Sequence, residues 1–368
     1  MPCDYSVRPY HPGDEEGIVE LLGTVFIGWP HFDLDCTPLD YWRWKIRDNP
    51  LEQARTIVAI SDSKIIGCTS TLPFRVKIGD NVYVACQGVD AAVHPSFRES
   101  GIFNKMQGLE SEIEKKIGIV FRMRSSANPI LIKRNIRRGF SRFPHDIIQF
   151  IRIHDIDLHY KMHQSKYSWL KKYGFNLIKF FNKLNNALRI SHESEQTFRI
   201  SEIAHFDDRI NVFWDEVKNY YNFIVEKTKD YLNWRYCDLR GGNYIIRIAE
   251  VEGIILGYSV LRINRYREEY LVGYIVDLLT LPHRLDVADA LVKDAIEYFD
   301  SNKINYNVCL SIKDHLYKKI FQRQGFVKRR LKMVIFFELH EKIGRDYEKL
   351  QTSSPSSVHL VYGDIDWI

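Results

Sequence analysis

The stretch AVHPSFRESGIF, residues 92–103, decides how the rest of this sequence is interpreted. It follows an apolar run typical of a strand and leads into helical spacing of apolar residues from Gly101 to Lys116. The amides of a first helical turn have no partner within the helix and lie at the positive end of its dipole. Gly101 lets a ligand approach the backbone, and Arg98 adds a cationic side chain. The turn is therefore predicted to bind a phosphate or pyrophosphate group.

Composition places the chain among soluble globular proteins. It has 368 residues, of which 45% are hydrophobic and 27% charged, enough for two ordinary domains. No run of about 18 apolar residues occurs, and the N-terminus is polar from the start. The net charge of +5 favours an anionic ligand or surface and is weak evidence for nucleic acid. Six cysteines lie far apart without a C-x-x-C pair, which predicts reduced thiols in a cytoplasmic protein: Cys3, Cys36, Cys68, Cys86, Cys237 and Cys309.

The chain also repeats itself at a spacing of about 190 residues. DYWRWKIRD at 40–48 matches DYLNWRYCD at 230–238, and RRGF at 137–140 matches RQGF at 323–326. These anchors occur in the same order, which predicts two copies of one domain. The predicted units are an N-terminal domain, a basic helical linker, a C-terminal domain and a tail, at residues 1–155, 156–196, 197–342 and 343–368.

Each copy is expected to contain antiparallel strands between helices, and IIQFIRI at 147–153 is expected to close the first domain as a strand. The stretch 161–189 contains six lysines, one arginine and no acid, with apolar residues at helical spacing. It is interpreted as a linker helix that packs on the domains. The alternative is a basic amphipathic surface in contact with an anionic membrane or a lipid-linked substrate.

Three segments resemble one family. AVHPSFRESGIF is similar to the acetyl-CoA signature of the GNAT N-acetyltransferases, V-x-P-x-x-R-x-x-G-x-G/A. NPILIKRNIRRGF at 128–140 resembles a later segment of that family, and YWRWKIRDNP at 41–50 resembles a branch with tandem-domain members. The resemblance implies a mixed α/β (α+β) fold of two tandem GNAT-like domains. In each, helices would flank a mostly antiparallel sheet that splays open between two central parallel strands.

The resemblance also implies site residues. A backbone amide near Val93 would hold the acetyl carbonyl, and the remaining cofactor-binding positions would be Ala92, Arg98, Glu99, Ser100, Gly101, Ile102, Phe103 and Asn128. Two positions depart from the family pattern. Phe103 stands where many members have a second small residue, and Asn135 stands where a tyrosine often serves as general acid.

The second copy departs further. Its equivalent turn, TLPHRLDVADAL at 280–291, has no glycine and carries Asp286 and Asp289 near the helix start. Carboxylates repel a pyrophosphate at short range. The second copy is therefore predicted to bind no cofactor and to shape the acceptor site.

An amine that attacks a thioester must lose a proton, which calls for a nearby acceptor. Asp90 is the nearest acid to the turn by sequence, with a turn-capping role as the alternative. The ending GDIDWI adds Asp364 and Asp366, two residues apart and so on one side of an extended strand. A solvated acidic tail is the alternative for that pair. His94 is expected to shape the turn. Trp42 and Trp44 are expected to anchor the core, with a sugar-stacking platform as the alternative.

The function that these features predict is an N-acetyltransferase that moves an acetyl group from acetyl-CoA to a primary amine by direct attack. The acceptor would be an amino sugar or another small amine, with no metal and no nucleic-acid partner. Two alternatives stay open at this point. One is an aminoacyl-tRNA-dependent peptidyl ligase of tandem-GNAT type, and the other is a non-catalytic acyl-CoA-binding protein.

Overall fold

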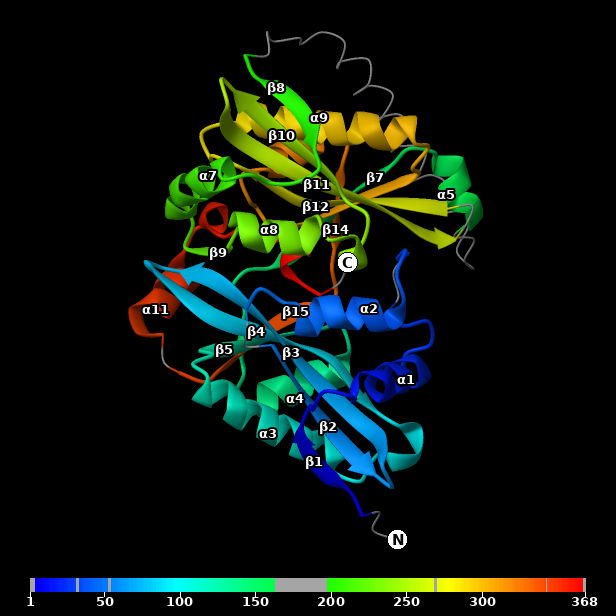
Figure 1. Cartoon of the computed structure of the whole chain (residues 1–368). Coiled ribbons are helices and arrows are strands. Elements are labelled where there is room, and N and C mark those ends of the chain that lie inside the picture. The colour runs from blue at the N-terminus through cyan, green and yellow to red at the C-terminus, as the bar shows by residue number, and fades with distance from the viewer. Residues whose placement is uncertain are drawn as a thin grey trace.

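The computed structural model describes residues 4–30, 33–51, 54–162, 197–267, 270–341 and 343–366. These residues build two stacked αβ halves, and the C-terminal segment lies between them (Figure 1). The mixed α/β fold with two mostly antiparallel sheets and flanking helices confirms the predicted fold class.

The N-terminal copy of the repeat contributes the following elements: β1 (Ser6–Pro9), α1 (Glu15–Val25), α2 (Pro38–Trp42), a π-helical turn (Arg43–Arg47), β2 (Arg55–Ser61), β3 (Lys64–Ile78), β4 (Asn81–Val93), α3 (Ile102–Lys116), β5 (Phe121–Ser126), α4 (Pro129–Arg137), β6 (Ser141–Arg142), β7 (Ile147–Ile153) and α5 (Ile156–Met162).

The C-terminal copy and the tail contribute these: β8 (Arg199–Ile203), α7 (Arg209–Val217), β9 (Phe223–Val225), α8 (Lys229–Tyr236), β10 (Ile245–Val251), β11 (Ile254–Arg267), β12 (Tyr270–Thr280), α9 (Leu285–Ser301), β13 (Tyr306–Ile312), α10 (Lys318–Arg323), β14 (Val327–Arg330), β15 (Val334–Leu339) and α11 (Gly344–Thr352).

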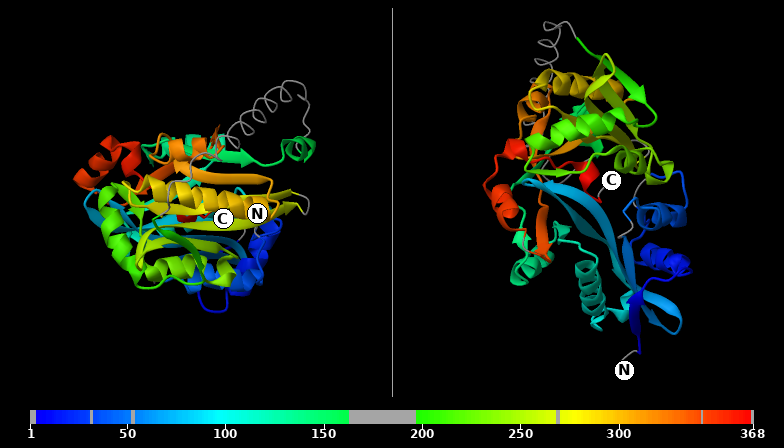
Figure 2. Two further views of the ribbon diagram at one scale, coloured as in Figure 1. Left: turned by 90° about the horizontal axis from the view of Figure 1, so that it is seen from above. Right: turned by 60° about the vertical axis from the view of Figure 1, so that its left-hand side comes forward.

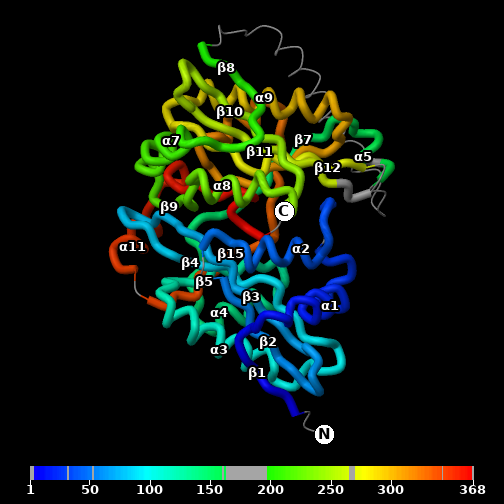
Figure 3. The backbone as a smooth tube through the Cα atoms, in the orientation of Figure 1, coloured from blue at the N-terminus to red at the C-terminus, as the bar shows by residue number. Residues whose placement is uncertain are grey.

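The two sheets exchange a strand. The first sheet has the order β1-β2-β3-β4-β5-β15-β6, with β9 paired to β3, and the second has the order β14-β7-β13-β12-β11-β10-β8. β7 therefore lies in the second sheet although its sequence belongs to the first copy, and β15 does the reverse (Figures 1 and 3). The expectation that residues 147–153 close the first domain is wrong. The apolar pattern predicts a strand, but it does not say which sheet the strand joins.

Each sheet splays at its centre, as predicted. β4 and β5 run parallel and pair only at Cys86–Arg122 and Gln87–Met123, while β4 continues to Val93. β12 and β13 pair from Val272–Tyr306 to Ile275–Cys309 and then also separate. Beyond these pairs the two central strands are no longer hydrogen-bonded to each other, and we call this region the splay of each sheet.

The C-terminal segment, residues 358–366, crosses between the two halves (red in Figure 3; Figure 2 shows it from two further sides). Val358, Leu360, Tyr362 and Ile365 are all 2% exposed or less, so the segment is part of the core. The amide of His359 donates to the carbonyl oxygen of Phe223 at 2.8 Å. The alternative of a solvated acidic tail is therefore wrong for the described residues.

Most of the predicted linker lies outside the described residues, which include only Ile156–Met162 of the range 156–196. Nearly all of the basic stretch 161–189, with its proposed membrane contact, lies outside them as well. In the described part of the chain, every helix is too short or too polar to span a membrane.

Candidate active site

The turn before α3 contains two left-handed residues and an uncrowded glycine. Gly101 caps α3 in the left-handed region at φ 81°, a conformation that glycine adopts without strain. Glu99 is also left-handed, at φ 68°. No atom outside the turn lies within 4 Å of a Cβ built on Gly101, so the backbone is open to a ligand there.

Local hydrogen bonds hold this turn in place. The amide of Ser96 donates to Nδ1 of His94 at 3.3 Å, which confirms that His94 shapes the turn. The hydroxyl of Ser100 donates to the carbonyl oxygen of Phe97 at 2.6 Å. Arg98, Glu99 and Ser100 are exposed. The Arg98 side chain therefore lies in solvent beside the start of α3.

At the other predicted cofactor positions, mainly backbone groups are left to contact a ligand. The side chains of Ala92 and Ile102 are 2% and 1% exposed and belong to the core. Asn128 accepts a hydrogen bond from the amide of Ile130 at 2.9 Å and caps α4. The ring of Phe103 lies against the Arg134 guanidinium, whose central carbon is 5.4 Å from the ring centroid.

The register of β4 directs one amide into the first splay. His94 donates to the carbonyl oxygen of Ile66 at 2.8 Å, so these two residues form a hydrogen-bonded pair. The neighbouring pair Val93–Gly67 is then a non-hydrogen-bonded one. The N–H of Val93 therefore points away from β3, toward the opening between β4 and β5. This is the amide that the family resemblance assigns to the acyl carbonyl.

Asp90 lies next to that opening in a buried ion cluster. Nζ of Lys45 contacts Asp90 at 2.9 Å and Asp366 at 2.8 Å. The side chain of Lys45 is 3% exposed, that of Asp90 is 8% exposed, and that of Asp366 is 25% exposed. The indole of Trp29 donates to the other oxygen of Asp90 at 3.2 Å. The Asp90 side chain therefore contacts Lys45 and Trp29. Among the described residues, it makes no hydrogen bond that caps the turn.

The backbone and the charge state of Asp90 are both unusual. Its φ of 50° is strained for a residue with a Cβ, and it lies where the β3–β4 register shifts between Cys68 and Ser70. Burial, together with the charge of Asp366, raises the pKa of Asp90 even though Lys45 opposes the shift. Burial alone would lower the pKa of Lys45, but the two carboxylates outweigh it and raise that pKa.

Gln87 holds the tail against this cluster. Its amide donates to the carbonyl oxygen of Asp364 at 2.6 Å, and its own oxygen accepts from the amide of Asp366 at 3.0 Å. The segment after α11 thus returns to β4 and delivers Asp366. Trp367 and Ile368 lie outside the described residues.

Asp364 lies elsewhere, in a second cluster of the same design. Nζ of Lys227 contacts Asp364 at 2.6 Å and Asp277 at 2.8 Å, and all three side chains are 0% exposed. Tyr236 and Tyr258 donate to Asp277 as well. The expectation that Asp364 and Asp366 act from one side of an extended strand is wrong. A 3₁₀ turn at Tyr362–Asp364 sends them to different lysines.

The sequence interpretation missed both lysines. A signal was present, because Val-Asp occurs in each copy three residues before the end of the strand-like run, at Asp90 and at Asp277. A carboxylate at the buried end of a strand needs a cationic partner, and a lysine is rarely buried without one. Lys45 lies in the π-helical turn, and Lys227 precedes α8.

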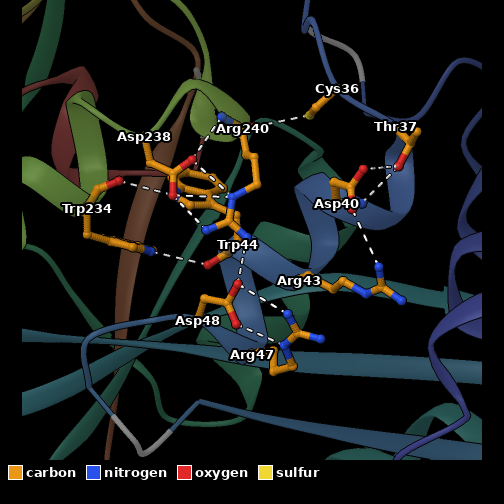
Figure 4. A network of polar contacts seen from close by, with 10 residues as sticks. All are labelled: Cys36, Thr37, Asp40, Arg43, Trp44, Arg47, Asp48, Trp234, Asp238 and Arg240. Carbon is orange, nitrogen blue, oxygen red and sulfur yellow. Dashed lines mark hydrogen bonds and ion pairs between the residues drawn. The ribbon is translucent and has the colours of Figure 1, made fainter.

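The tryptophan repeat forms the joint between the halves. Trp44 and Trp234 stack with ring centroids 5.1 Å apart, and each indole donates to the backbone oxygen of the other (Figure 4). Arg240 joins Asp238 and Asp48, which are also matched positions of the repeat, at 2.7 and 2.6 Å. Trp42 is 0% exposed. Both predicted tryptophans are therefore core anchors.

The second splay is filled by the protein itself. Val358, His359, Leu360 and Val361 line the same small cavity as the open ends of β12 and β13. The ring of His359 bonds the carbonyl oxygen of Leu278 at 3.0 Å.

The amide of Thr280, which matches Val93 in the repeat, donates to the hydroxyl of Tyr317 at 2.9 Å. Asp286 pairs with Arg284 at 2.7 Å, and Asp289 accepts from Gln324 at 3.1 Å. The groups that would meet a cofactor are therefore already engaged.

The closed end of the first splay carries a buried ionic floor. Arg122 is 0% exposed and contacts Glu110 at 3.0 Å and Glu114 at 2.6 Å. Thr69 and Thr71 donate to these carboxylates. Burial acts to raise the pKa of Glu114, but hydrogen bonds from His340 and Arg122 and the charge of Arg122 lower it to about 2.

Comparison with protein families gives one match. The family model described as "Acetyltransferase (GNAT) domain" matches residues 6–127, which contain the Gly101 turn and Asp90. No curated protein sequence matches the chain.

Solved structures share the fold over nearly the whole chain. A protein from Enterococcus faecalis V583, described as a probable N-acyltransferase, has a TM-score of 0.61 at 12% identity, covering 90% of this chain and 72% of that one. A tandem GNAT protein from the clavulanic acid biosynthesis pathway has a TM-score of 0.56 at 12% identity, covering 93% and 100%. Saccharomyces cerevisiae N-myristoyltransferase with bound myristoyl-CoA has a TM-score of 0.56 at 10% identity, covering 92% and 81%.

Proposed function

Because the chain carries a GNAT acetyltransferase domain at residues 6–127 within a tandem-GNAT fold, we propose that it transfers an acetyl group from acetyl-CoA to a primary amine. The observation that carries the proposal is the pairing of an open splay with the left-handed Gly101 turn at its mouth. The pyrophosphate binds the amides of the turn and Arg98. The N–H of Val93 binds the thioester carbonyl.

The residues beside the splay suit direct attack. The amine nitrogen attacks the carbonyl carbon, the C–S bond breaks, and the thiolate leaves. Asp90 accepts the proton that the nitrogen loses, directly or through a water molecule. Its raised pKa makes it a better base than an exposed carboxylate. Lys45 stays protonated and orients Asp90 and Asp366.

The ionic floor favours a short acyl group over a long one. A Cβ built on Gly88 would lie 3.4 Å from Cδ of Arg122, so the buried guanidinium lies directly beside β4 where the splay closes. A long alkyl chain entering there would displace the pairs of Arg122 with Glu110 and Glu114. Leaving such charges buried and unpaired costs about 3–5 kcal/mol. An acetyl group reaches the Val93 amide without disturbing them.

The proposal is tested with a panel of acyl-CoA donors and primary amines, by thiol release and by calorimetry. Acetyl-CoA is expected to bind, and kcat/KM should fall steeply as the acyl chain lengthens beyond a few carbons. Gly101→Val should abolish binding in a folded protein, because a branched side chain is strained at φ 81° and crowds the pyrophosphate. Unchanged affinity in that variant, or a preference for long acyl chains, would refute the proposal.

A further inference from the structure

A second site lies away from the splay, in a groove of about 760 Å³ where the two exchanged strands cross. The edge strand β6 of the first sheet and the edge strand β14 of the second sheet line it together with the chain near β7 and β15. Its floor is apolar and includes buried Phe143, Ile147, Met333 and Ile335. A groove of this size is typical of sites for small molecules.

The rim of the groove is strongly cationic. Its basic side chains are all exposed: Arg142, Lys313, Lys328, Arg330 and Lys332. The carboxylate on this rim is Asp146, which pairs with Arg142 at 3.2 Å and lies 3.8 Å from Lys313. The negative charge of Asp146 is therefore shared by Arg142 and Lys313, two of the five cations.

The other three cations come from one short segment. Lys328 and Arg330 alternate in β14, so they lie on one side of the strand, and Lys332 follows two residues after the strand and lines the same groove. No described ion pair joins a carboxylate to any of the three, although the charge of Lys328 contributes to lowering the pKa of Asp314. Like charges gathered over an apolar floor repel one another until an anion joins them.

We propose that this groove binds a small multivalent anion with an apolar body, such as an aromatic phosphate or a polycarboxylate. The cations hold the charged groups, and the floor takes the apolar part. A small molecule fits better than a nucleic acid, because the cations gather around one groove instead of forming a long stripe. Since the groove joins both sheets, the ligand holds the strand crossing together and raises the stability of the chain.

Calorimetry on the full chain at low salt tests the site, with 1-naphthyl phosphate, inorganic phosphate and inorganic tripolyphosphate as probes. Naphthyl phosphate is expected to bind more tightly than phosphate, and tripolyphosphate more tightly than phosphate. The triple variant K328S/R330S/K332S should bind naphthyl phosphate and tripolyphosphate at least tenfold more weakly. Its substituted side chains are exposed, so it should fold.

Two matched controls locate the binding. K64S/K116S/K293S removes the same charge from exposed positions away from the groove and should keep both affinities. G101V alters the pyrophosphate turn and should also keep them, which separates this site from the proposed acetyl-CoA site. Equal binding by the groove variant, or an equal loss in the surface control, would overturn the inference. Binding of RNA without binding of either small probe would overturn it as well.

Discussion

Trp44 and Trp234 face each other across the joint between the two halves, stacked at 5.1 Å and bonded indole to carbonyl in both directions. They occupy matched positions of the sequence repeat. Reciprocal bonds between matched residues are the mark of a local twofold relationship, as in an isologous dimer interface. The joint therefore depends on both rings at once.

Trp44→Ala should lower the free energy of unfolding by about 3–5 kcal/mol, because it removes a buried ring and leaves the carbonyl of Trp234 without its donor. Trp44→Phe should cost less, since a ring remains. The double variant Trp44→Ala/Trp234→Ala should cost less than the sum of the single changes. Denaturant unfolding of these three variants and of Trp234→Ala measures the four free energies. Strictly additive values for the two single alanine variants and the double variant would show that the two rings do not cooperate.

Asp90→Asn should lower kcat by about 10²–10⁴-fold with little change in acetyl-CoA affinity, because the proposed proton acceptor is lost. Asp277→Asn is the matched control at the same position of the second copy. It should destabilise the fold, since Lys227 is 0% exposed and loses a charged partner, yet leave kcat per folded molecule nearly unchanged. Equal losses of kcat in the two variants would reject a catalytic role specific to Asp90.

Substitutions at the two acids of the tail should likewise differ in their effects on stability and on turnover. Asp364→Asn should destabilise by on the order of 3 kcal/mol, because it leaves buried Lys227 with one carboxylate. Asp366, at 25% exposed, should tolerate Asn with a smaller loss of stability and a larger loss of turnover. Thermal unfolding measures the stability of both variants, and steady-state kinetics measures their turnover. Two variants with identical profiles would contradict it.

Titration of the full chain should saturate at one equivalent of acetyl-CoA. The C-terminal segment occupies the second splay, and the amide of Thr280 is bonded to Tyr317. Gly101→Val should then remove the whole signal and leave no second class of sites. Two equivalents in calorimetry would mean that the C-terminal segment leaves the second splay.

Acid should destabilise the protein through His315. Burial and the nearby His359 lower the pKa of His315 from 6.5 to about 3. Between about pH 3 and pH 6.5, His315 is protonated in the unfolded chain but neutral in the folded one. The free energy of unfolding therefore falls as the pH drops below 6.5. The fall attributable to this group should be about 1 kcal/mol for each pH unit. The free energy of unfolding of His315→Asn, measured over the same range, should depend less on pH. An equal slope would contradict the assignment.

The parts of the site that local sequence controls could be predicted. A strand ending at Val93, a helix starting after Gly101 and the shaping role of His94 follow from periodicity, helix-end chemistry and glycine, all within a dozen residues. The repeat likewise predicted two copies of one domain, and the family resemblance implied the splay at the centre of each sheet.

Long-range pairing could not be predicted in this way. β7 was correctly predicted as a strand, but either sheet offers an edge that would accept its apolar face. Lys45 and Lys227 were missed because a lysine beside helical residues usually faces solvent. Only the fold shows that each lysine lies between a strand-end aspartate and the returning tail.

The exchange of β7 and β15 also constrains how the protein is made. On the ribosome, β5 lacks its second neighbour, β15, until residues Val334–Leu339 emerge, and β7 cannot pair until β13 has been made. Neither sheet can close before the chain is nearly finished, so an unpaired β-edge is exposed during most of synthesis. Pairings that join residues about 200 positions apart also slow refolding. We therefore expect one late cooperative folding event for the whole chain, and no independently folded half that could be separated from it.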